Sequence, residues 1–113
     1  MSNGFPLNKL KVDVNVAISE QLSSAGEPGG MRFVAVISPA EITGTEMTFE
    51  ISIDGVNFHE VLIPDEGTAY TVKIAATKLT PVDYRYFWFA PFIKVKCATA
   101  QEAARVFGLV FAV

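Results

Sequence analysis

Three kinds of side chain in this sequence have the chemistry that catalysis or metal binding requires: the single histidine, the single cysteine and a few carboxylates in predicted turns. His59 would have to anchor any Ser-His-Asp relay or histidine metal site, because the sequence has no second histidine. It lies on a predicted strand between Phe58 and Glu60, where a surface role across the strand pair is expected. Cys97 lies in an alternating apolar strand, where an inert buried thiol is expected. Neither residue predicts a catalytic centre.

Carboxylates in the predicted turns offer a second kind of chemistry. Asp54, Asp65 and Glu66 could supply oxygen ligands for a hard cation such as calcium at one end of the fold. Their spacing matches no calcium-binding loop, and acidic residues are ordinary turn formers. Gly29-Gly30 lacks the strand, loop and helix context of a phosphate-binding loop and is interpreted as a flexible tip. We therefore expect no enzymatic activity, no metal and no cofactor.

The segment from Tyr84 to Phe92 is the strongest local anomaly, because six of its side chains are aromatic. Three interpretations compete: packing in the core, a subunit interface, and an aromatic platform on which sugars stack. Core packing together with an interface is favoured, because aromatic side chains dominate the energetics of both. Tyr84, Tyr86 and Trp88 are the candidate interface residues in this segment.

These residues need elements that position them, and the clearest element is a β-hairpin from Glu46 to Ile63. Apolar residues in its first strand alternate with polar ones, which predicts one buried face; they are Met47, Phe49, Ile51 and Ile53. Asp54-Gly55 predicts a tight turn with positive backbone φ angles. The return strand contains Phe58, Val61, Leu62 and Ile63. One hairpin is marginal in water, so further strands must cover it.

Short apolar runs between turn signals predict the remaining strands, at residues 10–18, 31–38, 70–74, 93–97 and 105–113. Residues 21–30 are rich in Gly and Ser and are interpreted as a loop, with disorder favoured over function. Residues 75–83 are expected to form a loop with at most one helical turn. The last strand is apolar on both faces, which predicts a central, doubly covered position. Seven to eight short strands predict an antiparallel β-sandwich or jelly roll.

Length and composition limit the organisation and partners of the chain. Its 113 residues fit one domain at 10–113, preceded by an arm at 1–9 whose apolar anchors are Phe5 and Leu7. No secretory signal or membrane-spanning run is apparent, so a cytosolic product is expected. Nine basic and twelve acidic residues are spread without runs, which argues against nucleic acid as a partner.

The balance of apolar and charged residues favours an oligomer. Hydrophobic residues make up 50% of the chain and charged residues 19%, against roughly 25% charged in a usual soluble domain. A small domain has much surface for its volume, so part of this apolar excess is expected at contacts with other chains. Phe5 and Leu7 on the arm join the aromatic residues as candidate contacts.

Two stretches resemble small virion proteins of tailed bacteriophages. Phe49-Glu-Ile-Ser-Ile-Asp-Gly-Val-Asn-Phe58 resembles their Ser-x-Asp-Gly-x-x-aromatic hairpin. Gln101-Glu-Ala-Ala-Arg-Val-Phe-Gly-Leu-Val110 resembles their Gln-x-Ala-x-Arg ending, which is followed by a last apolar strand. Pro91-Phe-Ile-Lys-Val-Lys96 is similar to the strand that precedes that ending, although the segment from there to Gln101 is shorter here. The resemblance covers about the second half of the chain.

The resemblance implies a function and partners. It implies a jelly-roll cement or decoration protein that binds the major capsid protein between capsid subunits and stabilises the head. The chain would be made in the host cytoplasm, would assemble as a trimer and would reside on the capsid surface of the virion. The alternative is a carbohydrate- or receptor-binding β-sandwich of a phage tail or fibre, because the Asp-Gly hairpin also occurs in sugar-binding sandwiches.

Overall fold

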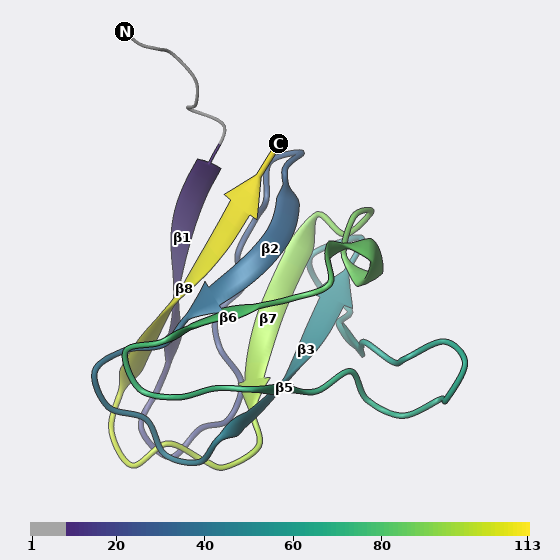
Figure 1. The fold of residues 1–113 in the computed structure, drawn as a ribbon. Helices are drawn as coiled ribbons and strands as arrows, with labels where there is room; N and C mark the ends of the chain where they lie inside the picture. Colours follow the sequence, from purple (N-terminus) through teal and green to yellow (C-terminus); the bar gives the residue numbers. More distant parts are fainter. Residues whose placement is uncertain (1–8) are drawn as a thin grey trace, which may run out of the picture.

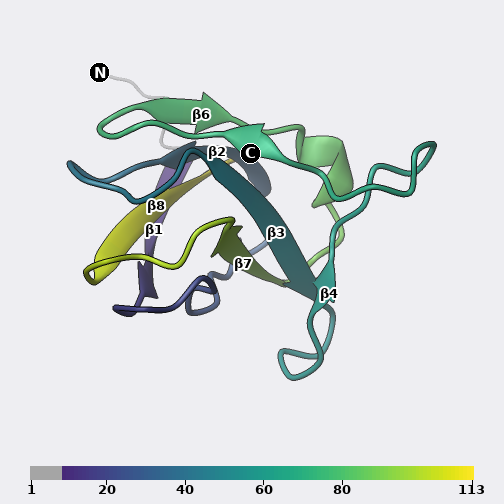
Figure 2. The ribbon, with the colours of Figure 1, turned by 90° about the horizontal axis from the view of Figure 1, so that it is seen from below.

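Apolar side chains on eight short strands meet between two antiparallel β-sheets in the computed structural model, which describes residues 9–113 (Figure 1). The first sheet has the order β1-β8-β2-β6, and in the second sheet β3 pairs with β4, β5 and β7. Figure 2 shows the two sheets on opposite sides of the core. The elements are β1 (Lys9–Val16), β2 (Arg32–Ile37), β3 (Glu46–Ser52), β4 (His59–Glu60), β5 (Val72–Lys73), β6 (Leu79–Pro81), the 3-10 helix η1 (Tyr84–Tyr86), β7 (Phe92–Cys97) and β8 (Arg105–Ala112).

The strands pair as in one long antiparallel hairpin that is folded over on itself, so that strands near the two ends of the chain pair with each other and strands in the middle pair with each other. β1 pairs with β8, and β2 with β6. Residues 22–26 bridge to β7 through Leu22 with Lys96 and Gly26 with Ile93. The innermost pairs join β3 to β4 and β5. The predicted antiparallel β-sandwich is confirmed, and its strand order is that of a jelly roll.

Three phenylalanine rings from different parts of the chain meet at the centre of the core. The centroid of Phe33 on β2 lies 5.6 Å from that of Phe49 on β3, and Phe87, which follows η1, lies 4.9 Å and 5.2 Å from these two. All three pairs are edge-to-face, an arrangement worth about 0.5–1.5 kcal/mol per pair beyond the burial of area. Phe87 therefore ties the aromatic segment to both sheets.

Residues 22–26, in the segment expected to be disordered, pair with β7 at the edge of the second sheet, so the expectation of disorder is wrong for this part of the segment. Ser23 N–H donates to Val95 C=O at 2.9 Å, and Ser23 Oγ accepts from Val95 N–H at 3.0 Å. Gly26 exchanges two backbone hydrogen bonds with Ile93, at 2.7 and 2.9 Å. The hydroxyl of Ser23 accepts the hydrogen bond from Val95 N–H that a backbone carbonyl would accept in a regular strand pair. A pattern of alternating apolar residues does not reveal such a bond.

The hairpin turn is longer than the predicted two-residue turn, because β3 ends at Ser52 and β4 begins at His59. Gly55 has a φ of +80°, whereas Asp54 has no positive φ. Ser52 Oγ accepts hydrogen bonds from the N–H groups of Asp54 and Gly55, at 3.2 and 2.8 Å. The pleat therefore ends at Ser52, which is buried, and Ile53 is 76% exposed. The prediction that Ile53 shares the buried face is wrong.

β8 lies between β1 and β2, as the apolar run predicted. Its inward residues Phe107, Leu109 and Phe111 are buried, but Val106 on the outer face is exposed. Within residues 9–113, the expected cover on both faces of β8 is therefore incomplete.

The region expected to be a loop at residues 75–83 contains a strand, β6, which pairs with β2, and η1 is capped by Asp83. The arm residues Phe5 and Leu7 lie outside the described residues. In the part of the chain from residue 9 onward, no helix is long and apolar enough to cross a membrane.

Candidate functional site

Two consecutive tight turns in the aromatic segment direct neighbouring aromatic side chains to opposite sides. η1 begins after Asp83, whose Oδ1 accepts a hydrogen bond from Arg85 N–H at 3.1 Å. Phe87 N–H then donates to Tyr84 C=O, and Ala90 N–H donates to Phe87 C=O, both at 3.0 Å. Phe87 and Ala90 are three residues apart and both face the core. The two residues between them are consequently turned outward.

Trp88 and Phe89 are these outward residues, and they form an exposed aromatic pair. Trp88 is 70% exposed and Phe89 is 51% exposed. Their ring centroids lie 5.9 Å apart with an interplanar angle of 77°. The two rings therefore present a ridge with edges rather than one flat face. Exposure of large apolar side chains to water is unfavourable, and burial against a partner would remove this cost.

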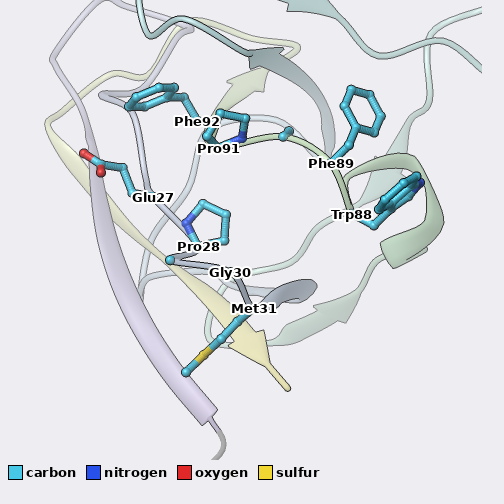
Figure 3. Close-up of a pocket in the computed structure, with 10 residues that line it drawn as sticks. Glu27, Pro28, Gly30, Met31, Trp88, Phe89, Pro91 and Phe92 are labelled. Carbon is cyan, nitrogen blue, oxygen red and sulfur yellow. The ribbon is translucent and has the colours of Figure 1, made fainter.

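A pocket of about 340 Å³ lies beside this pair, between residues 27–31 and residues 88–92 (Figure 3). The side chains that line it are mostly apolar and include Pro28, Met31, Trp88 and Phe89. Glu27 supplies the one charged side chain of the lining, and Figure 3 shows it on the far side of the pocket from Trp88. The pocket is thus suited to apolar groups.

A second hollow of about 320 Å³ is also lined by Phe89. Its lining comes from β3, from β4 and the residues that follow it, and from the aromatic segment. The lining residues are Ile51, Glu60, Val61, Leu62, Pro64, Arg85, Tyr86 and Phe89. Phe89 lines both hollows, and Trp88 lines the first. We call Trp88, Phe89 and these two hollows the aromatic surface.

The predicted interface residues are separated by the fold. Tyr84 is exposed, and the Arg32 guanidinium lies 4.9 Å from the centre of its ring. Tyr86 is half-buried, packs edge-to-face on Tyr70 at 4.8 Å and also lines the second hollow, so it contacts both the core and the aromatic surface. Trp88 is on the aromatic surface, and its neighbour Phe89 is a residue that the sequence analysis did not select. Tight turns do not keep every second side chain on one face, so Tyr84, Tyr86 and Trp88 do not all share one surface.

The residues with catalytic or metal-binding chemistry do not converge. His59 is exposed on β4 opposite Ile51. Cys97 is fully buried, and desolvation raises the pKa of its thiol to about 11. Hydrogen bonds from the N–H groups of Asn57 and Val56 hold the pKa of the Asp54 carboxyl well below its usual range. Within residues 9–113, no three His, Cys, Asp or Glu side chains are grouped as metal ligands would be.

Comparison with known proteins identifies a fold and no family. Neither a protein-family model nor a curated protein matches the sequence. The crystal structure of the SPBc2 prophage-derived protein YomS is similar over 98% of this chain and 100% of that chain, with a TM-score of 0.60 and 9% identity. A Yersinia pseudotuberculosis-derived mitogen has 15% identity over 94% of this chain and 86% of that chain, with a TM-score of 0.38. The first similarity shows that the described part of the chain shares the fold of YomS.

Proposed function

We propose that this chain is a non-enzymatic structural protein of a tailed-bacteriophage particle, which binds between subunits of the major capsid protein and stabilises the head. The observation that carries the proposal is the aromatic surface, where Trp88 and Phe89 are exposed beside a mostly apolar pocket and Phe89 also lines a second hollow. Interface hot spots are enriched in such aromatic side chains, and truncation of one typically costs about 2 kcal/mol or more of binding free energy.

A phage context has two separate supports. The fold of the described residues is shared with a prophage-derived protein. The hairpin around Asp54-Gly55 and the ending from Gln101 to Arg105 resemble segments of small phage virion proteins. On this proposal the chain is made in the host cytoplasm and resides on the capsid surface, where many copies each bridge neighbouring subunits. Their contributions then add over the shell by mass action.

A homo-trimer is part of the proposal. Its support is the apolar composition, together with exposed apolar side chains away from the aromatic surface, such as Leu79 on β6 and Val106 on β8. Native mass spectrometry of the purified chain measures the oligomeric state directly. A monomer at micromolar concentration would contradict this part and would leave the capsid assignment in place.

The first test is the copy number of this chain in purified particles, measured by quantitative mass spectrometry against the major capsid protein. A ratio close to that of the capsid protein supports a cement role. A few copies per particle would favour a tail or fibre, and absence from particles would overturn the proposal.

The second test is binding of Trp88→Ala to particles that lack this chain. We expect at least a roughly tenfold loss of affinity, the equivalent of about 1.4 kcal/mol. Ile18→Ala is the matched control, because Ile18 is also exposed and lies next to Ser19, which bonds to Gln101 C=O away from the aromatic surface. Equal binding by both folded variants would remove Trp88 from the interface.

Carbohydrate or receptor binding by a tail or fibre module is the second candidate, favoured by the exposure of Trp88 beside a pocket. The 77° angle between the rings of Trp88 and Phe89 is less suited to sugar stacking than two coplanar rings. Glycan-array binding that Trp88→Ala abolishes would favour this candidate over the capsid role. An array without signal would count against it.

A further inference from the structure

β1 is a long strand at the edge of the first sheet. It pairs with β8 over its full length without a register shift, and no other strand among residues 9–113 pairs with it (Figure 1). The other edges are short or covered: β4, β5 and β6 have two or three residues each, and residues 22–26 bridge to β7. Native proteins shorten or cover edge strands, because their backbone groups accept another strand. A regular edge of eight residues is therefore a candidate pairing surface.

The backbone of Asn15 shows which groups of β1 face away from β8. Its C=O accepts from Ser24 N–H at 2.9 Å, and its N–H donates to Ser24 Oγ at 3.0 Å. In an antiparallel pair, both backbone groups of every second residue point to the same side of the strand. Lys11 and Asp13 are in phase with Asn15, so their N–H and C=O groups also point away from β8. No hydrogen bond from another residue between 9 and 113 reaches these groups.

The charges of Lys11 and Asp13 fit a second copy of the same strand. Both side chains are exposed, and Lys11 Nζ lies 3.5 Å from Asp13 Oδ1. When two copies of β1 run antiparallel about a two-fold axis at Val12, Lys11 of each copy lies opposite Asp13 of the other. Opposite charges in directly opposed positions stabilise a sheet, and like charges destabilise it. A shift by two residues in either direction would instead place Lys11 opposite Lys11, or Asp13 opposite Asp13.

The same register buries an exposed apolar side chain and pairs the outward backbone groups. Leu10 is 43% exposed, and it would lie opposite Val14 of the second copy. Lys11 and Asp13 would exchange both backbone hydrogen bonds in each of their two pairs, as in a regular antiparallel ladder. The ladder would end at Asn15, whose backbone is already bonded to Ser24. The backbone, the charges and the apolar side chains therefore favour one register.

We propose that two copies of this chain pair along β1 about a two-fold axis at Val12, so that their first sheets join into one continuous sheet. Such a contact is isologous, because the same strand contributes to it from both sides. It uses no residue of the aromatic surface and does not rest on the proposed function. A chain that associates only through β1 forms dimers, whereas trimers that also pair through β1 form hexamers.

Lys11→Asp and Asp13→Lys test this register. Each variant alone places like charges opposite each other in both pairs, so its dissociation constant for pairing should rise by about tenfold or more. An equimolar mixture of the two should associate again, because one then supplies only acidic and the other only basic side chains at these positions. Sedimentation velocity at submillimolar concentration measures the association of each sample.

Lys78→Asp and Asp65→Lys are the matched controls, because they make the same changes of net charge at exposed positions outside β1. Each control alone should associate as the wild type does, and mixing the two should add nothing. Dimers or hexamers of the wild type support the proposal, and a wild type found only as monomers or trimers would overturn it. Single variants that associate as the wild type does, or a mixture of K11D and D13K without gain, would overturn it as well.

Val12→Cys tests the position of the axis. Directly opposed residues of a pair without hydrogen bonds have Cα atoms about 4.5 Å apart, which is within the range of a disulfide. Oxidised glutathione should therefore link V12C into covalent dimers. Leu10→Cys is the control, because its two copies would lie four residues apart, or about 13 Å. Cys97 is buried and is common to both variants.

Equal cross-linking of the two cysteine variants would contradict the register and overturn the proposal. These measurements contain no capsid, so their failure leaves the capsid proposal standing. Failure of capsid binding likewise leaves the pairing along β1 standing.

Discussion

The side-chain amide of Gln101 pairs with the backbone of Thr43 in both directions. Gln101 Oε1 accepts from Thr43 N–H at 2.9 Å, and Gln101 Nε2 donates to Thr43 C=O at 2.8 Å and to Thr99 C=O at 3.0 Å. Gln101 is 1% exposed, so these bonds are shielded from water. Its side-chain amide makes the hydrogen bonds that a neighbouring strand backbone would make, and it joins the connection before β3 to the connection before β8. The buried side chain of Gln101 therefore stabilises the contact between these two connections.

Replacement of Gln101 by alanine should destabilise the chain by about 1–3 kcal/mol, because it leaves backbone groups of Thr43 and Thr99 without their partner. Denaturant unfolding measures the change. Glu102→Ala is the control, since this neighbouring side chain is exposed, and a change within about 0.5 kcal/mol is expected. Equal destabilisation by the two substitutions would contradict the pairing role of Gln101.

Asp54 should make the stability of the hairpin depend on pH. Its carboxylate accepts from the N–H groups of Val56 and Asn57, both at 2.8 Å, and from Ser52 Oγ at 2.9 Å. These bonds lower its pKa from the ordinary 3.8 in the folded state. The contribution is therefore present above the unfolded pKa and is lost as pH falls toward the folded one.

The measurement is the unfolding free energy of the wild type and Asp54→Asn at about pH 6 and about pH 3. The advantage of the wild type should shrink at the lower pH, because asparagine does not titrate. Asp65→Asn, in the turn after β4, is the matched control. A difference between wild type and Asp54→Asn that grows as pH falls would have the wrong sign.

Cys97 should resist thiol reagents in the folded chain. Burial raises its pKa to about 11, so little of the reactive thiolate is present at pH 8, and the strand that carries it is paired on both sides. Labelling with an aromatic disulfide should be slow in buffer and complete within seconds in denaturant. Rapid labelling without denaturant would indicate that β7 opens.

The regular strands could be predicted because their pleat puts apolar residues at every second position. β3 and β7 show this pattern, and Phe49 and Val95 are buried where it requires them to be. Residues 22–26 lack this alternating pattern. Ser23 pairs through its hydroxyl, and Gly26 lies so close to Leu109 that a side chain there would collide with it. Sequence alone shows neither partner.

The segment that forms the candidate site could be predicted from the sequence, but the residues that it exposes could not. Aromatic density identified residues 84–92, whereas exposure depends on the turns that follow η1. These turns bury Phe87 between the two sheets and leave Phe89 outside. The contacts that decide between the two positions come from Phe33 and Phe49, which are distant in sequence.

The close approach between Gly26 and Leu109 should be detectable as an energetic coupling between substitutions at these two positions. A Cβ at this position would lie 2.9 Å from Leu109 Cδ1, so Gly26→Ala should cost about 1–3 kcal/mol through overpacking. Leu109→Ala removes the obstructing methyl and costs about 2–5 kcal/mol by itself. The double variant should therefore be less destabilised than the sum of the single changes. Simple additivity in denaturant unfolding would show that Leu109 is not the obstacle.

Phe87 and Trp88 are adjacent in sequence and should respond oppositely to truncation. Phe87 is 2% exposed among Phe33 and Phe49, so Phe87→Ala should lower the unfolding free energy by about 3–5 kcal/mol. Trp88→Ala should change it by less than about 1 kcal/mol, because this side chain is mostly outside the core.

Thermal or denaturant unfolding of both variants, together with particle binding, separates the two roles. Phe87→Ala should lose binding only in proportion to its unfolded fraction, and folded Trp88→Ala should lose binding at unchanged stability. If Trp88→Ala were as unstable as Phe87→Ala, its loss of binding would report unfolding, and Trp88 would be a core residue rather than the contact that the aromatic surface requires.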